Sequence, residues 1–340
     1  MVQPVRVGVV GCGYWGPNLI RNFQRQADAQ VVAVADQRPE RLEPILRASP
    51  GLEGHADAAA LIARADIDAV VIATPVATHF PLALAALQAG KHVFVEKPLA
   101  DSEAACARLI EEAERRKLVL MVDHVFVFTS AVQKIEAMLA RGDLGELYYY
   151  DSVRVNLGLF QPDVNVIWDL AVHDLAILDA IAPGPPLTVA ATAHRHIPGQ
   201  AENMAALTLS YAGNFTAHIN VNWLSPVKVR RTLIGGSKRM IVYDDIEPDH
   251  KIMVYEKGVD YVDPGPDAAK VRVSYRTGDM AAPHLDGREA LDRAAAHFLE
   301  CVRSGEAPRT DGRAGLRVVA VMAAAMRSLA AGGTAMGINA

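Results

Sequence analysis

The sequence lacks several features, and each absence removes a class of protein. Only three of its 340 residues are cysteines, Cys12, Cys106 and Cys301, and they form no Cys-x-x-Cys pair. We therefore expect neither a disulfide framework nor a structural zinc site. We expect the protein to belong to a reducing cytoplasmic compartment. No uninterrupted apolar run reaches the roughly 18 residues of a membrane span. We also expect no secretion signal, because no charged leader and apolar stretch precede the first strand.

An excess of positive charge is also missing. The chain has 34 Lys and Arg against 39 Asp and Glu, a formal net charge of -5. This balance provides no basic surface for nucleic acid. Charged residues make up 21% and hydrophobic residues 51% of the sequence, proportions that exclude disorder. The length suits a large core divided between two domains.

Short runs rich in Val and Ile alternate with helical patterns through residues 1–125. The expected strands are 5–10, 31–36, 69–73, 91–95 and 118–122, and the expected helices are 17–26, 40–48, 57–64, 78–89 and 102–116. The strands are continuously apolar, which indicates burial on both faces. The pattern predicts an α/β Rossmann domain, a doubly wound parallel sheet covered by helices.

The pattern changes over residues 126–340. A helix at 130–141 is followed by expected strands at 146–157, 187–196, 203–211, 214–222, 228–235 and 239–243, with one helix at 167–181 between them. Such a run of hairpins predicts an α+β domain with a large open, mostly antiparallel sheet. Residues 244–285 are interpreted as a long excursion. Helices at 288–304 and 312–331 close the chain, and we leave open that they pack back on the first domain.

The first strand leads into the turn Gly11-Cys12-Gly13-Tyr14-Trp15-Gly16. A Gly-x-Gly-x-x-Gly turn between a strand and a helix is typical of a dinucleotide site, because its glycines allow pyrophosphate to approach the backbone. The alternative is a glycine-rich turn without a ligand. Cys12 is interpreted as a small packing residue. The predicted cofactor contacts in the turn are Gly11, Gly13, Tyr14, Trp15 and Gly16.

Asp36 ends the second expected strand, twenty residues after Gly16. An acidic residue at this place hydrogen-bonds a ribose 2′-hydroxyl and repels a 2′-phosphate, which favours NAD as the cofactor. Arg38 and Arg41 are close in sequence and keep NADP as the alternative. Asp36 and Arg38 are both predicted to contact the cofactor.

The segment Ala73–His79 ends the next clear strand, and Thr74, Pro75 and His79 are predicted cofactor contacts there. Thr78 has the alternative role of capping the helix that follows. His79 could equally be an ordinary residue of the first helical turn.

A lysine follows a buried strand in Glu96-Lys97-Pro98. Burying an ammonium group without a partner is costly, so such a lysine snorkels, pairs or takes part in chemistry. Ligands of an open parallel sheet bind at the carboxyl ends of its strands, where Lys97 is expected. We predict Lys97 to be catalytic, and Glu96 and Lys97 to contact the cofactor. No metal site is expected.

Asp169 and His173 are four residues apart in Trp168-Asp169-Leu170-Ala171-Val172-His173-Asp174, so on a helix they share one face. A carboxylate beside an imidazole in an otherwise apolar segment can orient the ring and tune its pKa toward neutrality. Both are predicted to be catalytic. The competing interpretation is a surface ion pair on an amphipathic helix.

Two further groups carry weaker signals. His194 and His196 share a strand face but have no accompanying acidic or cysteine cluster, so a solvated strand is preferred over a metal site. A basic cluster spans a hairpin and is either a solvated sheet face or a clamp for substrate phosphates; its members are Lys228, Arg230, Arg231, Lys238 and Arg239.

Together, the glycine turn, Glu96-Lys97-Pro98 and Asp169-x-x-x-His173 resemble the Gfo/Idh/MocA family of oxidoreductases over nearly the whole chain. The resemblance implies an N-terminal nicotinamide-binding domain and a C-terminal open sheet that carries the substrate and often mediates dimers or tetramers. It also implies that Lys97, Asp169 and His173 meet at the nicotinamide, often with a cis peptide before Pro98.

Two stretches, 13–19 and 163–169, are similar to a narrower branch acting on nucleotide-linked sugars, such as UDP-N-acetylglucosamine 3-dehydrogenases. Where inositol dehydrogenases tend to carry arginines after the sixth strand, this chain has Asp123-His124-Val125-Phe126-Val127-Phe128-Thr129. This departure counts against a free cyclitol as substrate.

The reaction expected from this resemblance is reversible oxidation of a secondary alcohol on a sugar ring, at carbon 3 of a nucleotide-linked sugar. His173 would take the hydroxyl proton, Asp169 would orient His173, and Lys97 would hydrogen-bond the same hydroxyl. Predicted substrate contacts are Arg154 and Asn156, which alternate on one strand and so face one side, and Asn165, Trp168, Lys228 and Arg230. Arg230 would pair with a diphosphate.

Two other functions stay open. One is a dehydrogenase or reductase of a free sugar, anhydrosugar or cyclitol that uses the same catalytic residues. The other is a non-catalytic nicotinamide sensor, and the retained Lys97, Asp169 and His173 argue against it. The expected partners are a small-molecule sugar substrate and further copies of the chain, with no nucleic acid and no membrane.

Overall fold

The computed structural model describes residues 3–158, 160–161, 164–262 and 272–338, and the chain divides into two compact units. Unit 1 takes in the chain up to Thr129 together with Arg288–Ala323. Unit 2 takes in Ser130–Gly287 and residues 324–338. Helix α9, Gly312–Ala330, begins in unit 1 and ends in unit 2.

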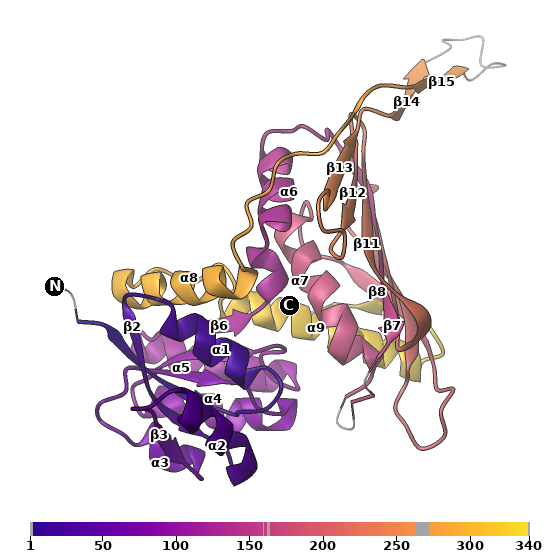
Figure 1. Ribbon diagram of the computed structural model, residues 1–340. Coiled ribbons are helices and arrows are strands. Elements are labelled where there is room, and N and C mark those ends of the chain that lie inside the picture. Colours follow the sequence, from indigo (N-terminus) through magenta and orange to yellow (C-terminus); the bar gives the residue numbers. More distant parts are fainter. Residues whose placement is uncertain (1–2, 159, 162–163, 263–271, 339–340) are drawn as a thin grey trace. The chain divides into compact units, whose positions relative to one another are not determined.

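Unit 1 is built on a six-stranded parallel sheet with the strand order β3-β2-β1-β4-β5-β6 (Figure 1). Its strands are β1 Val5–Val10, β2 Ala29–Ala35, β3 Glu53–His55, β4 Ala69–Ile72, β5 His92–Glu96 and β6 Leu120–Asp123. The predicted doubly wound parallel sheet is confirmed. The short strand β3 was not predicted, because its three residues include no large apolar side chain.

The helices of unit 1 are α1 Gly16–Gln24, α2 Pro39–Ala48, α3 Ala58–Ile62, α4 His79–Gln88, α5 Glu103–Arg116 and α8 Ala290–Ser304, with short 3₁₀ turns η1 Val76–Thr78 and η2 Val125–Phe128. Three buried rings join α1, β5 and α8. Phe23, Phe94 and Phe298 pack edge to face, with centroids 5.5 to 6.0 Å apart. Helix α8 therefore shares the core of the sheet although it lies near the end of the chain.

Unit 2 contains a nine-stranded sheet with the order β16-β13-β12-β11-β7-β10-β9-β8-β17. Its strands are β7 Leu147–Leu157, β8 Thr188–His194, β9 Met204–Ser210, β10 Thr216–Asn222, β11 Leu224–Gly236, β12 Met240–Asp244, β13 Ile252–Tyr255, β16 Met280–Ala281 and β17 Met336–Gly337. Strands β7 and β10 pair in parallel, and the other described pairs are antiparallel. The prediction of a mostly antiparallel sheet is confirmed.

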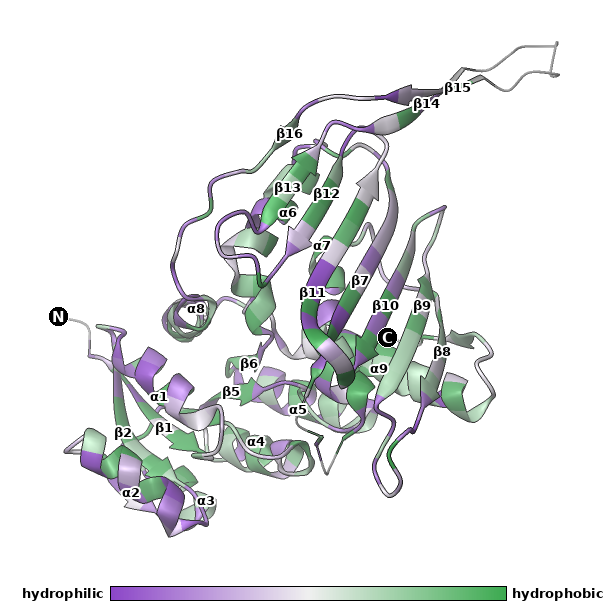
Figure 2. Cartoon of the chain, turned by 45° about the vertical axis from the view of Figure 1, so that its right-hand side comes forward, coloured by the Kyte–Doolittle hydropathy of each residue, from purple (hydrophilic) through white to green (hydrophobic). Residues whose placement is uncertain are grey.

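Helices α6, Ser130–Ala140, and α7, Val172–Ile181, lie over one face of this sheet (Figure 1). Its strands alternate between apolar and polar residues, whereas β1 is apolar almost throughout (Figure 2). One covered face explains the alternation, and two covered faces explain the continuous apolar run.

Two sequence predictions for unit 2 need correction. The helix expected over 167–181 is a π-helical turn, η3 Ile167–Ala171, followed by α7. The expected excursion over 244–285 is partly structured. It contributes β13 and β16 to the large sheet, and β14 Gly258–Val262 pairs with β15 Arg272–Arg276 in a separate ribbon. Residues 263–271 and Asp163 lie outside the described residues.

Candidate active site

The glycine turn of unit 1 has a shape that only glycine allows at two positions. Gly11 has a φ of +96°, and a Cβ there would lie 2.3 Å from the Ala73 carbonyl oxygen. A Cβ on Gly16 would lie 2.2 Å from the carbonyl oxygen of Gly11. The turn leads directly into α1, and the positive end of the helix dipole favours an anion at this place. Tyr14 and Trp15 lie exposed on the same turn.

Asp36 lies just beyond β2 and is held by backbone amides. Its carboxylate accepts hydrogen bonds from the N–H of Cys12 at 2.8 Å and of Arg38 at 2.9 Å. The guanidinium groups of Arg38 and Arg41 lie 3.7 and 4.0 Å from it. The turn and the fixed carboxylate fit the pyrophosphate and ribose of a dinucleotide. Burial raises the pKa of the Cys12 thiol to about 12, which agrees with a packing role.

His79 lies between the loops that follow β4 and β5. Its side chain is buried, and its ring nitrogens lie 2.8 Å from the Pro98 carbonyl oxygen and 2.9 Å from that of Thr74. The Lys97–Pro98 peptide bond is cis. The Thr78 hydroxyl lies 2.7 Å from both the Thr74 hydroxyl and the Pro75 carbonyl oxygen, so it does not cap α4 as the alternative prediction had it. His79 thus ties the Thr74 loop to the Lys97 loop.

Three titratable residues are buried around Lys97. Glu96 ends β5 and Asp123 ends β6, opposite each other in the ladder, and His124 follows. Burial raises the pKa of Glu96 to about 7, and burial and the Glu96 charge raise that of Asp123 well above its usual range. Burial and the Lys97 charge lower the pKa of His124 to about 3, so its ring is neutral. Sequence reasoning noted Asp123 and His124 but gave them no role.

In unit 2, Asp169 lies in the π-helical turn and His173 in the first turn of α7. The Trp223 indole N–H donates to Asp169 Oδ2 at 3.0 Å, and Trp223 is 1% exposed. This contact joins residues 54 apart in the chain, and the sequence carried no signal for it. Because π-helical turns are frequent at functional sites, the local backbone agrees with a functional helix here.

The structure commits Arg154, a predicted substrate contact, to a buried ion pair. Its guanidinium donates to Asp174 at 2.6 and 3.1 Å, and the Ser152 hydroxyl donates to the same carboxylate at 2.7 Å. Arg154 is 4% exposed and Asp174 is 1% exposed. Ser152, Arg154 and Asn156 alternate along β7, the spacing that places side chains on one face.

The other predicted substrate contacts differ in their exposure and in how many hydrogen bonds and ion pairs they already make within the protein. Asn165 Oδ1 accepts from the N–H of Ile167 at 3.1 Å and of Trp168 at 3.3 Å, so Asn165 caps the η3 turn. Arg230 donates to Asp245 at 3.1 Å, Lys228 is exposed and Trp168 is half-buried. Within the basic cluster, Arg231 and Arg239 are also ion-paired, with Asp244 and Glu256. Neighbouring carboxylates therefore offset much of the cluster's positive charge.

Two searches of the described residues complete the site. No group of three or more His, Cys, Asp or Glu side chains there is arranged to hold a metal ion. The His194 and His196 rings lie 5.9 Å apart, and His196 contacts Asn203. Among all the residues that the structure describes, no helix combines the length and the apolar character needed to cross a membrane.

Both units match profiles of one protein family. Residues 5–124 match a profile described as an oxidoreductase family with an NAD-binding Rossmann fold, and residues 132–242 match the Gfo/Idh/MocA C-terminal domain. The chain belongs to the Gfo/Idh/MocA family of oxidoreductases. The family resemblance noted in the sequence is confirmed, and unit 1 is an NAD-binding Rossmann domain.

Three curated relatives indicate the range of this family. The UDP-N-acetylglucosamine 3-dehydrogenase of Acidithiobacillus ferrooxidans is 30% identical over 93% of this chain and 94% of its own. Its crystal structure has a TM-score of 0.79, with 26% identity over 97% of this chain and 99% of that one. The dTDP-3,4-didehydro-2,6-dideoxy-alpha-D-glucose 3-reductase of Saccharopolyspora spinosa is 26% identical over 90% of both chains. Inositol 2-dehydrogenase 2 of Saccharopolyspora erythraea is 35% identical over 51% of this chain and 52% of its own.

These comparisons identify the chain as an oxidoreductase of a family that acts on CH–OH groups with NAD. Its relatives include dehydrogenases of nucleotide-linked sugars and of inositol. The Gfo/Idh/MocA assignment therefore agrees with the chemistry expected from Lys97, Asp169 and His173.

Proposed function

We propose that this oxidoreductase transfers a hydride between NAD and carbon 3 of a nucleotide-linked sugar. The observation that carries the proposal is similarity along almost the whole chain to two proteins named for this position, a UDP-sugar 3-dehydrogenase and a dTDP-sugar 3-reductase. The inositol dehydrogenase has higher identity but aligns with only about half of the chain. A free sugar or cyclitol is therefore the second candidate.

The proposed chemistry assigns one task to each residue. Bound NAD supplies the hydride acceptor. As the C–H hydride leaves the sugar carbon, His173 takes the hydroxyl proton and a carbonyl forms. Asp169, held by the Trp223 indole, orients the imidazole. Lys97 donates a hydrogen bond to the same oxygen and stabilises the developing negative charge. In the reverse direction, His173 returns the proton.

The substrate class is tested by ligand binding. Thermal unfolding of the full chain with NAD should shift upward with UDP or dTDP, because a ligand that binds only the folded state stabilises it. Free sugars and inositol serve as the comparison set. A shift with inositol and none with either nucleotide at millimolar concentration would replace the proposal with its second candidate.

The unit 2 residues are tested by a graded pair of variants. His173→Ala should lower kcat by about two to four powers of ten. Trp223→Phe removes the N–H that orients Asp169 and should lower kcat about tenfold, and thermal unfolding reports the cost of replacing the buried indole by a smaller ring. Turnover of the true substrate by His173→Ala at the wild-type rate would refute the assignment. NAD affinity, measured by fluorescence, should stay constant in both variants.

A further inference from the structure

Two buried carboxyl groups lie next to each other beside Lys97. Glu96 and Asp123 are partners in the parallel ladder of β5 and β6 and are 8% and 3% exposed. Residues paired across neighbouring parallel strands project to the same face of the sheet, so the two carboxyl groups lie side by side away from water. An ionised carboxylate only accepts hydrogen bonds, so one of these groups can donate to the other only if it carries a proton.

The surroundings of this carboxyl pair separate it from water. The N–H of Val122 donates to the Thr310 carbonyl oxygen at 2.8 Å, and the Thr310 hydroxyl donates back to the Val122 carbonyl oxygen at 2.7 Å. Helix α9 then starts at Gly312, and a Cβ on Gly315 would lie 2.8 Å from Val122. The chain near residue 310 therefore packs closely against the strand that carries Asp123.

The charged group that acts on the pair is Lys97. Its backbone N–H donates to Glu96 Oε2 at 3.3 Å, and its ammonium charge favours ionisation of both carboxyl groups. His124 is the other titratable neighbour, and it stays neutral. Among the described residues, the His124 ring nitrogens and Asp123 Oδ1 have no hydrogen-bond partner.

We propose that Glu96 and Asp123 share one proton and so hold a single negative charge beside Lys97, which makes Asp123 a positioning residue for the Lys97 ammonium group. Two ionised carboxylates on adjacent strands would repel each other strongly in a dry site, whereas one carboxylate and one carboxylic acid attract. The raised pKa values of both groups agree with this state. The functional consequence rests on the proposed role of Lys97 as hydrogen-bond donor.

The shared proton is tested by infrared difference spectroscopy of the full chain without substrate. At about pH 8 the wild type should show the carbonyl stretch of one buried protonated carboxylic acid, and Asp123→Asn should remove it. In Glu96→Gln the midpoint of the Asp123 band should move to lower pH, because the like-charged neighbour is gone. Asp66→Asn, far from the pair in sequence, is the matched control and should leave the band intact. Absence of the band from the wild type, or its persistence in Asp123→Asn, would overturn the proposal.

The positioning role is tested by a double-mutant cycle on kcat at about pH 8. Each single amide variant leaves one carboxyl group to carry the charge, and kcat should fall by less than about tenfold. The double variant Glu96→Gln/Asp123→Asn removes the charge, and kcat should fall more than the product of the single effects, by on the order of a hundredfold or more. Additive losses, or equal changes in kcat and in NAD affinity, would reduce the pair to a structural role. If no sugar is turned over by the wild type, the proposed function fails, while the infrared result still decides whether the proton is shared.

Discussion

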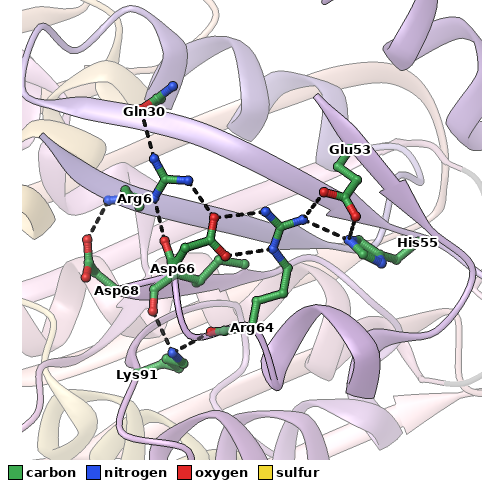
Figure 3. A network of polar contacts seen from close by, with 9 residues as sticks. Arg6, Gln30, Glu53, His55, Arg64, Asp66, Asp68 and Lys91 are labelled. Carbon is green, nitrogen blue, oxygen red and sulfur yellow. Dashed lines mark hydrogen bonds and ion pairs between the residues drawn. The ribbon is translucent and has the colours of Figure 1, made fainter. Parts of the chain in front are cut away.

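Charged groups at the two ends of the unit 1 sheet differ in their burial and in their ion pairs. At the amino ends of the strands, Arg6 and Arg64 both bind the Asp66 carboxylate, at 2.5 and 2.9 Å (Figure 3). Arg64 also reaches Glu53 and His55 of β3. These side chains are partly exposed, with 42% of the Asp66 side chain accessible, so water also solvates them.

At the carboxyl ends of β5 and β6, around Lys97, the titratable groups are buried, and the His124 ring nitrogens and Asp123 Oδ1 have no hydrogen-bond partner among the described residues. Glu96, Asp123 and His124 are each less than a tenth exposed. Their pKa values move toward the neutral forms, whereas Arg64 and Arg6 hold the pKa of Asp66 well below its usual range. The groups around Lys97 therefore have pKa values shifted by burial, as is common at functional sites, whereas the groups at the amino ends are stabilised by ion pairs.

Two lysines make the same contrast. Lys91 precedes β5, is 8% exposed, and donates to the carbonyl oxygens of Arg64 at 2.8 Å and Ile67 at 2.6 Å. Lys97 follows the same strand at its other end. One strand therefore has a structural lysine before it and a candidate catalytic lysine after it.

The largest expected effect separates these lysines. Lys97→Met should lower kcat by about two to three powers of ten with little change in thermal stability. Lys91→Met leaves two buried carbonyl groups without a donor and should cost on the order of 1–3 kcal/mol of unfolding free energy. Activity assays and thermal unfolding of both variants check this. Equal losses of kcat in the folded proteins would abolish the distinction between the two ends.

The next effect concerns pH. Because the pKa of Glu96 is raised from its ordinary 4.5 to about 7, the folded protein binds this proton more tightly than the unfolded chain. Its contribution to stability is full below about pH 4.5 and is lost as pH rises through about 7. As the pH rises from about 4.5 to about 7, the unfolding free energy of Glu96→Gln should therefore increase relative to that of the wild type, by on the order of 1–3 kcal/mol. Chemical denaturation at several pH values measures the gain, and a constant difference would contradict it.

At the other end of the sheet the sign reverses and the effect is smaller. The lowered pKa of Asp66 gives stability above its ordinary pKa that is lost as the pH falls. Asp66→Asn should lower the Tm by about one to two degrees near neutral pH and by less in acid, because the ion pairs are solvated. Scanning calorimetry is the measurement, and a difference that grew with acidity would be inconsistent with this assignment.

Salt should give the smallest effect. Raising the ionic strength to about 1 M shortens the Debye length to about 3 Å and screens exposed charges more than buried ones. The Tm difference between Asp66→Asn and the wild type should shrink, while that of Glu96→Gln should persist. If both Tm differences disappeared in salt, the charges at the carboxyl end would be as exposed to solvent as those at the amino end.

Much of the fold follows from patterns within single segments. The Val-rich runs identify five of the six unit 1 strands, and the glycine turn identifies the cofactor end of the sheet. Strand β3 escapes such reasoning because Glu53, Gly54 and His55 pair with β2 without burying apolar surface. The π-helical turn at Asp169 is also invisible to a pattern that assumes helical spacing throughout.

Contacts between distant segments set the limit for the site. Glu96 and Asp123 each end an apolar strand, and only the register of β5 and β6 shows that they face each other. Arg154 is a predicted substrate contact on the sequence alone, and only the structure shows that the buried Asp174 of α7 is its partner. Pairing decides whether a charge is structural or functional, and pairing depends on tertiary structure.

The three buried cysteines make thiol labelling a probe of local opening in unit 1. Cys12, Cys106 and Cys301 all belong to this unit, each is buried, and burial raises their pKa values to about 12, 12 and 11. Native thiols in that state scarcely react, so a thiol reagent labels the chain at the rate at which unit 1 opens. Unit 2 contains no cysteine, so its opening adds no label. Cys12 lies within the glycine turn. If NAD slows the labelling of Cys12, the decrease in its labelling rate measures how far NAD suppresses opening of that turn.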